Sequence, residues 1–138
     1  MTVARPLISV AIPAFNESAN LDDLVARLQS VFNDLADRYD YEVVICENGS
    51  SDDTYDQLLA IRAVNPRVKI VQLVRNFHME GGMTAALAHV SGDACVIMSA
   101  DLQDPPEMIP RLLEHWEDGY ENVYTVITKR HGEGIARR

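Results

Sequence analysis

The stretch LISVAIPAFNESANLDDLVARLQSVF, residues 7–32, decides the fold class, because it joins a buried strand to an amphipathic helix. Its apolar start, Leu7–Ile12, predicts a strand buried on both faces, and Pro13 is expected to end that strand. After a polar turn, apolar residues recur at helical spacing from Leu21 to Leu35, with Asn20 placed to cap the helix. A strand followed by such a helix is the first half of a βαβ unit.

The same alternation continues to the end of the chain. Further strands are predicted over Glu42–Cys46, Val68–Val74, Ala94–Met98 and Asn122–Thr128. Further helices are predicted from Ser51 or Asp52 to about Ala63, over Met83–Val90, and from Pro105 or Pro106 to Gly119, with Asp104 as a cap. Five strands separated by four helices predict one α/β domain over residues 1–138, a Rossmann-like α/β/α sandwich with a mainly parallel sheet.

Composition limits the classes of function. The chain has 138 residues, 47% of them hydrophobic and 24% charged, as in soluble globular domains. A formal net charge of −9 argues against a nucleic-acid surface, which needs Lys and Arg to neutralise phosphates. Without a long apolar run or a signal-peptide core, the chain is expected to be cytoplasmic. The basic cluster at residues 129–138, KRHGEGIARR, is either a solvated tail or a contact for anionic lipid or pyrophosphate.

Polar clusters follow four of the predicted strands: PAFNE, ENGSSDD, RNFHMEGG and SADLQD. In open α/β sheets ligands bind outside the carboxyl ends of the strands, so these clusters are expected to form one site. Asp101 and Gln103 offer oxygen ligands for Mg²⁺ or Mn²⁺ bridging a diphosphate, or they bond only the turn backbone. Glu47 and Asn48 could pair with a nucleobase edge or form a plain turn, and Glu17 has the same two interpretations. The amides of EGGM, residues 80–83, are expected at a helix start, where they could receive phosphate oxygens.

Several common catalytic motifs do not occur in the sequence. It contains no Gly-x-Ser-x-Gly elbow, no phosphate-binding Gly-x-x-x-x-Gly-Lys loop and no His-Glu-x-x-His pair. The four histidines do not form a ligand set, although His78 lies in a loop beside the expected site. These observations exclude the usual hydrolase, NTPase and metalloprotease classes.

Taken together, ISVAIPAFNESANL, YEVVICENGSSDDT, VRNFHMEGGMTAAL and MSADLQDPPEMIP resemble, in that order, the motif blocks of family 2 glycosyltransferases with the GT-A fold. They are most similar to the branch of dolichyl-phosphate mannose synthases and bacterial polyprenyl-phosphate glycosyltransferases. The resemblance implies a UDP- or GDP-linked sugar donor and a lipid-linked or saccharide acceptor, most simply a polyprenyl phosphate at the cytoplasmic face of the membrane. It also implies a divalent cation, Mg²⁺ or Mn²⁺.

The resemblance assigns roles by position. In the implied nucleotide-sugar site, the nucleoside pocket is lined by Pro13, Phe15 and Glu17. The base is met by Glu47 and Asn48, and the base and ribose lie near Arg75 and Asn76. The Asp-x-Asp segment corresponds to Ser99, Ala100 and Asp101. The implied metal ligands are Asp101 and Gln103. No catalytic residue is identified, because the family's catalytic domain extends further and this chain is expected to be the donor-binding half, truncated before the acceptor-binding part.

This sequence departs from the family pattern at four places. Asn48 replaces the second residue of the acidic pair, a mild change because an amide still fits a base edge. Ser99 stands where the Asp-x-Asp motif has its first carboxylate, which is expected to weaken metal binding. His78 and Met79 replace a common Gly-Lys pair, and Ile127 lies about where an arginine is frequent. The alternative is therefore a degenerate, non-catalytic nucleotide-binding or scaffolding module. A sugar nucleotidyltransferase would instead need a glycine- and arginine-rich loop after the first strand, which PAFNESAN lacks.

Overall fold

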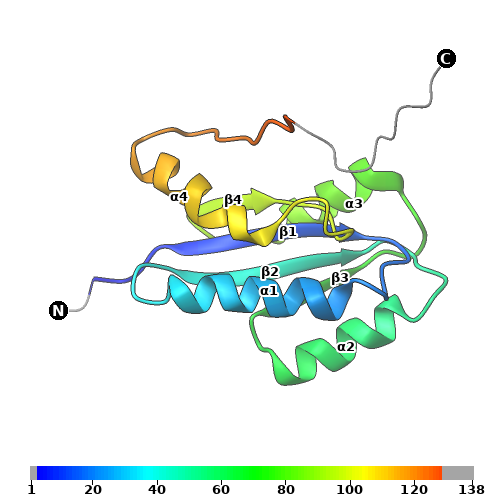
Figure 1. Ribbon diagram of the computed structural model, residues 1–138. Coiled ribbons are helices and arrows are strands. Elements are labelled where there is room, and N and C mark those ends of the chain that lie inside the picture. Colours follow the sequence, from blue (N-terminus) through cyan, green and yellow to red (C-terminus); the bar gives the residue numbers. More distant parts are fainter. Residues whose placement is uncertain (1–2, 129–138) are drawn as a thin grey trace, which may run out of the picture.

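The computed structural model describes residues 3–128, which form four strands and four α-helices (Figure 1). The strands are β1 Leu7–Ala14, β2 Asp40–Glu47, β3 Val68–Gln72 and β4 Ala94–Ile97. The helices are α1 Leu21–Asp34, α2 Thr54–Val64, α3 His78–Leu87 and α4 Ile109–Glu117, and a 3₁₀ turn, η1 Pro106–Met108, leads into α4. All strand pairs are parallel, in the order β3-β2-β1-β4. The predicted α/β class with a mainly parallel sheet is confirmed.

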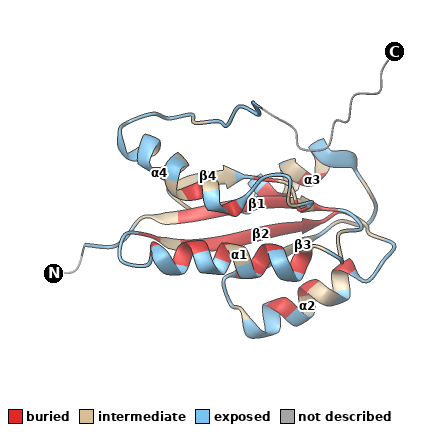
Figure 2. Cartoon of the chain, in the orientation of Figure 1, coloured by how far each residue is buried: buried red, intermediate tan, exposed pale blue. Residues whose placement is uncertain are grey.

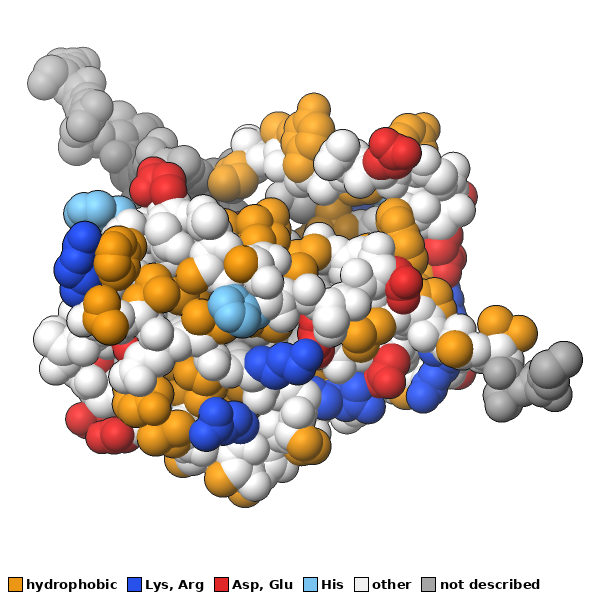
Figure 3. Space-filling view, turned by 180° about the vertical axis from the view of Figure 1, so that it is seen from behind, with side chains coloured by type: hydrophobic (Ala, Val, Ile, Leu, Met, Phe, Trp, Pro, Cys, Tyr) orange, Lys and Arg blue, Asp and Glu red, His pale blue; other side chains and the backbone are white. Residues whose placement is uncertain are grey.

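The helices cover the two faces of the sheet unequally. Alternate residues of the strands point to opposite faces, so Ile8, Val10 and Ile12 of β1 join the large core with α1, α2 and α4. The other face carries a smaller cluster around Ala11 and Val44, covered by α3. Buried residues run along β1 and β2 and along the inner side of α1 (Figure 2). Seen from behind, the molecule exposes hydrophobic side chains among Lys and Arg (Figure 3).

Pro13 does not end β1, as the sequence predicted, but lies inside it, opposite Cys46. The register explains why a residue without an N–H is tolerated there. The carbonyl groups of Leu7 and Ala11 accept hydrogen bonds from the β4 side, so odd-numbered residues of β1 direct their backbone toward β4. The pairing with β4 ends at Ala11, and Pro13 therefore interrupts no ladder bond.

The fifth strand predicted over Asn122–Thr128 is not present, and this segment has no regular structure. Figure 1 shows it leading away from the end of α4 without joining the sheet. Tyr124, Val126 and Ile127 are exposed by 83%, 72% and 66%, so these strand-forming residues have no buried face. Such residues form a strand where a packed layer covers one face, and within residues 3–128 no helix covers this segment.

Local details at the helix ends also differ from the prediction. Helix α3 begins at His78 rather than at Met83, so residues 80–83 lie within the helix and not at its start. Asn20 does not cap α1 with its side chain but donates to Glu17 Oε2 at 2.8 Å. Asp104 bonds back to Ser99 instead of capping the next helix. Among residues 3–128, no helix combines the length and apolar character needed to cross a bilayer.

Candidate functional site

Four loops follow the four strands at the carboxyl edge of the sheet, and their side chains bind the loops to one another. Asn16, after β1, accepts the N–H of Ser51, after β2, on its Oδ1 at 2.8 Å. Asn48, also after β2, uses its amide on the loop after β3: Oδ1 accepts from Phe77 N at 3.0 Å, and Nδ2 donates to His78 O at 2.8 Å. The first three loops therefore form one connected surface.

Each of the four loops contains a residue with a positive φ angle. These residues are Asn16 at 53°, Gly49 at 73°, His78 at 63° and Leu102 at 63°. Only glycine adopts this region without cost, and residues held there cluster at functional sites because the surrounding contacts must compensate the strain. Three such residues other than glycine, at one edge of the sheet, mark this edge as the candidate site.

A pocket of about 310 Å³ opens between these loops. It is lined by the last residues of β1 and by residues that follow β1, β2, β3 and β4: Pro13, Ala14, Phe15, Glu17, Asn48, Asn76, His78, Met79, Ser99, Ala100 and Asp101. Eight of them belong to the site expected from the sequence. The convergence of the loops on one pocket follows from the parallel sheet, which brings all four strand ends to the same edge.

Three expected site residues do not line the pocket. Glu47 is buried and accepts the N–H of Ser50 on Oε1 at 2.6 Å, which holds the turn after β2. The Arg75 guanidinium lies over the Phe77 ring, 3.9 Å from its centroid, and donates to the Asn76 carbonyl. Gln103 is exposed, and its backbone N–H donates to Asp101 Oδ1 at 3.1 Å.

The segment after β4 is organised around Ser99. Its hydroxyl lies 2.6 Å from Asp101 Oδ1 and 3.0 Å from Asp104 Oδ2, and its backbone N–H donates to Asp104 Oδ2 at 2.9 Å. Within the described residues, no three His, Cys, Asp or Glu side chains form a group that could hold a metal ion. Asp101 fits a site in which one carboxylate is completed by water and ligand oxygens, as Mg²⁺ accepts, rather than a cage made by the protein alone.

Hydrogen bonds also keep the carboxylate of Asp52, in the loop after β2, in its charged form. Asp52 Oδ1 accepts the N–H of Thr54 at 2.9 Å, and Oδ2 accepts the N–H of Ser18 at 3.4 Å. The bonds from Thr54 hold the pKa of Asp52 below its usual value. Asp52 therefore stays ionised while it orders the start of α2.

A larger pocket, of about 590 Å³, lies between β4, the end of α4 and the segment Tyr120–Thr125. No residue expected at the site lines it. The basic cluster at 129–138 lies outside the described residues. The smaller pocket is the candidate site because it combines polar groups with the strained loops.

The sequence interpretation left three lining residues unassigned: Ala14, His78 and Met79. Ala14 follows directly from the extension of β1 past Pro13. His78 and Met79 carry a signal that could have identified them, because both depart from the Gly-Lys pair common at that place in the motif block.

The family model described as "Glycosyl transferase family 2" matches residues 9–138. The glycosyltransferase sll0501 of Synechocystis sp. (strain ATCC 27184 / PCC 6803 / Kazusa) is 40% identical over 126 residues, which cover 91% of this chain and 39% of that protein. The chain spans about two fifths of the length of the curated relatives that it matches.

Solved structures share the fold. The mannosyltransferase PcManGT from Pyrobaculum calidifontis, in complex with GDP-Man and Mn²⁺, superposes with a TM-score of 0.65 at 19% identity, covering 80% of this chain and 32% of that one. Glucosyl-3-phosphoglycerate synthase from Mycobacterium tuberculosis, in complex with Mn²⁺, UDP and phosphoglyceric acid, gives a TM-score of 0.57 at 29% identity. That match covers 80% of this chain and 39% of the synthase.

Proposed function

This chain belongs to glycosyl transferase family 2, and on that premise we propose that residues 1–138 form the donor-binding part of a glycosyltransferase. The pocket of about 310 Å³ takes the nucleoside diphosphate of a UDP- or GDP-linked sugar. The observation that carries the proposal is the assembly of eight expected site residues around this one pocket. The complexes of PcManGT with GDP-Man and of the mycobacterial synthase with UDP support the class of ligand.

The residues divide between the base and the diphosphate. Phe15 is 42% exposed and lines the pocket, so its ring is available to stack on a base. Pro13 and Glu17 complete that side, and Asn76 faces it from the loop after β3. On the opposite side, Ser99, Ala100 and Asp101 approach the diphosphate. Asn48 lines the same pocket and holds the loop after β3 through Phe77 N and His78 O. Glu47 and Arg75 act behind this surface: Glu47 holds the turn after β2, and Arg75 lies over the Phe77 ring.

Asp101 would hold Mg²⁺ or Mn²⁺, with Gln103 as a further ligand and the remaining positions filled by water and diphosphate oxygens. A bound cation would supply positive charge to the departing nucleoside diphosphate. The carboxylate of Asp101 keeps its Oδ1 engaged with Ser99 and Gln103, which fixes the direction of its second oxygen.

The proposed acceptor is a polyprenyl phosphate. The motif blocks support the polyprenyl-phosphate branch, in which an acceptor phosphate oxygen attacks the anomeric carbon of the donor sugar and the nucleoside diphosphate leaves. This reaction would take place at the cytoplasmic face of the membrane, in the cell envelope pathway of the acceptor lipid.

Nucleotide titration of the ¹⁵N-labelled chain tests the proposed site. UDP or GDP is expected to shift the amide resonances of Phe15, Asn76, Met79 and Ala100, which belong to the candidate pocket. The resonances of Val123 and Tyr124, beside the larger pocket, serve as the internal control and are expected to stay in place. Shifts confined to the larger pocket would contradict the proposed site.

Ser99→Asp is expected to increase metal binding. The new carboxylate would lie beside Asp101 and Asp104, so repulsion between like charges lowers the Tm without metal. Saturating Mn²⁺ is expected to restore that loss and to raise the Tm by several degrees, as a ligand bound only by the folded state does. Thermal unfolding with increasing Mn²⁺ measures the effect.

Ser30→Asp is the matched control for added charge, because Ser30 is exposed on α1, away from the site. It is expected to show the small Mn²⁺ response of the wild type. If Ser99→Asp follows the same Mn²⁺ titration curve as the control, the alignment of residues 99–101 with a metal-binding motif is wrong.

A second candidate function is a nucleotide-binding module without transferase activity. The observation that favours it is the hydroxyl of Ser99, which donates a hydrogen bond to Asp101 Oδ1. In the family motif, position 99 would carry a second carboxylate instead. Such a module would bind UDP or GDP with the same affinity whether or not Mn²⁺ is present.

A further inference from the structure

The candidate pocket lacks the positive charge that its proposed ligand needs. Its lining residues, all of them within the described chain, include two carboxylates, Glu17 and Asp101, but no Lys or Arg. A nucleoside diphosphate is itself anionic, so its binding requires hydrogen-bond donors or cations at the phosphates. The guanidinium of Arg75 is directed to the Phe77 ring instead. Among the lining residues, His78 alone carries a ring N–H donor.

Two side-chain amides also line the pocket. Asn48 uses both ends of its amide on the backbone of Phe77 and His78. Asn76 accepts the N–H of His78 on its Oδ1 at 2.7 Å, and within the described residues its Nδ2 makes no hydrogen bond. Among residues 3–128, the imidazole of His78 makes no hydrogen bond or ion pair, while its backbone makes two.

The backbone of His78 is held in a strained conformation at this position. Its φ of 63° lies in the left-handed region, where a side chain costs free energy that glycine avoids. The two hydrogen bonds, from Asn48 Nδ2 to its carbonyl and from its N–H to Asn76, compensate that cost. A histidine that is strained, exposed and free at the mouth of a pocket is better explained by ligand contact than by folding.

We propose that His78 is a donor-site residue whose imidazole donates a hydrogen bond to the diphosphate of the bound nucleotide. This inference rests on the proposed function, because it needs a nucleotide in the pocket. His78 thereby supplies a hydrogen-bond donor at the phosphates, in a pocket whose lining contains no Lys or Arg. His78 is the first residue of α3, so its imidazole comes to the pocket from that helix.

The inference is tested by calorimetric titration of the whole chain, as wild type and as His78→Gly, with UDP and with GDP at constant Mn²⁺. Glycine removes the imidazole and relieves the positive φ, so the Tm is expected to stay the same or to rise by a few degrees. The affinity for the nucleotide that binds the wild type is expected to fall about tenfold, since a charge-assisted hydrogen bond is lost. The matching nucleoside, uridine or guanosine, followed by ligand-detected NMR, is expected to bind both proteins equally.

His89→Ala is the matched control, because His89 is exposed just beyond α3 and contacts only the Ala85 carbonyl through its ring. It is expected to keep the wild-type nucleotide affinity. Wild-type affinity in His78→Gly would overturn the inference, and so would an equal loss for nucleotide and nucleoside or a fall in Tm. If the wild-type chain binds neither UDP nor GDP, the proposed function itself fails, and this inference fails with it.

Discussion

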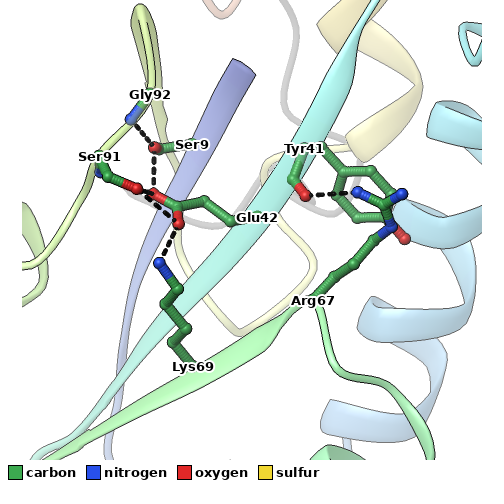
Figure 4. Close-up of polar contacts among 7 residues, drawn as sticks. All are labelled: Ser9, Tyr41, Glu42, Arg67, Lys69, Ser91 and Gly92. Carbon is green, nitrogen blue, oxygen red and sulfur yellow. Dashed lines mark hydrogen bonds and ion pairs between the residues drawn. The ribbon is translucent and has the colours of Figure 1, made fainter.

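Glu42→Gln is expected to lower the free energy of unfolding by about 3 kcal/mol, a large share of the stability of a small domain. The carboxylate is buried on β2, and its oxygens are the centre of a polar cluster on the α3 face (Figure 4). Oε1 accepts from Ser9 Oγ at 2.6 Å and from Ser91 N at 2.7 Å, and Lys69 Nζ forms an ion pair with Oε2. Glutamine would keep the volume but lose the charge and turn a donor toward these donors.

The cluster joins four separate parts of the chain. Ser9 lies on β1, Glu42 on β2 and Lys69 on β3, while Ser91 and Gly92 belong to the loop before β4. Gly92 N donates to Ser9 Oγ at 2.8 Å, so the loop is held through two residues of the cluster. Loss of the carboxylate therefore weakens the attachment of all four strands at their amino ends.

The lowered pKa of Glu42 predicts that the folded chain loses stability in acid. Burial raises the pKa of Glu42, but the hydrogen bonds from Lys69, Ser9 and Ser91 outweigh it and lower the pKa from 4.5 to about 2. Since the folded-state pKa is depressed, the contribution is fully present above about pH 4.5 and is lost as the pH falls toward 2. Urea unfolding at pH 7 and pH 3 measures this loss, which is expected to be much smaller in Glu42→Gln.

Glu107→Gln provides the control for removing a paired carboxylate. Glu107 forms a two-bond ion pair with Arg27, but its side chain is 54% exposed. Surface pairs contribute about 1 kcal/mol or less, so this variant is expected to unfold close to the wild type. Equal urea midpoints for Glu42→Gln and Glu107→Gln at pH 7 would show that the buried cluster does not stabilise the fold.

Gly49→Ala is expected to destabilise the chain by about 2–4 kcal/mol and to abolish measurable nucleotide binding. A Cβ at Gly49 would lie 2.4 Å from the carbonyl carbon of Arg75 and 2.5 Å from the backbone nitrogen of Asn76. Backbone atoms cannot turn aside, so the loop after β3 must move. That loop carries Asn76 and His78, which line the candidate pocket.

Gly119→Ala is the control for Gly49→Ala, because it adds a side chain at a positive φ without a clash. Gly119 also has a positive φ, of 97°, but a Cβ there would meet nothing within 4 Å. Its substitution is expected to cost about 1 kcal/mol and to leave nucleotide affinity unchanged. Urea unfolding and calorimetry on both variants make the comparison; a Gly49→Ala protein that binds nucleotide like Gly119→Ala would refute the role of this contact.

The elements that could be predicted from the sequence are those whose pattern reports burial. The apolar runs in β1 and β2 and the helical spacing in α1 are consequences of one core, and they predicted these elements to within a few residues. The grouping of the polar loops could also be predicted, because parallel strands bring their carboxyl ends to one edge.

Features that depend on tertiary contacts could not be predicted. The tolerance of Pro13 depends on where β4 stops, and the absence of a strand over Asn122–Thr128 depends on a missing covering layer. The direction of the Asn48 amide toward Phe77 and His78 depends on the path of the loop after β3. The positive φ of His78 comes from the same contacts, which no local pattern encodes.

Calorimetric titration of this chain with UDP and GDP, with and without Mn²⁺, tests the nucleotide-sugar site, alongside Asp101→Ala. We expect saturable binding of at least one nucleotide, tighter with Mn²⁺, and no Mn²⁺ effect once the Asp101 carboxylate is removed. Absence of binding for both nucleotides in the folded wild-type chain would contradict the claim that the pocket between the four loops is a nucleotide-sugar site.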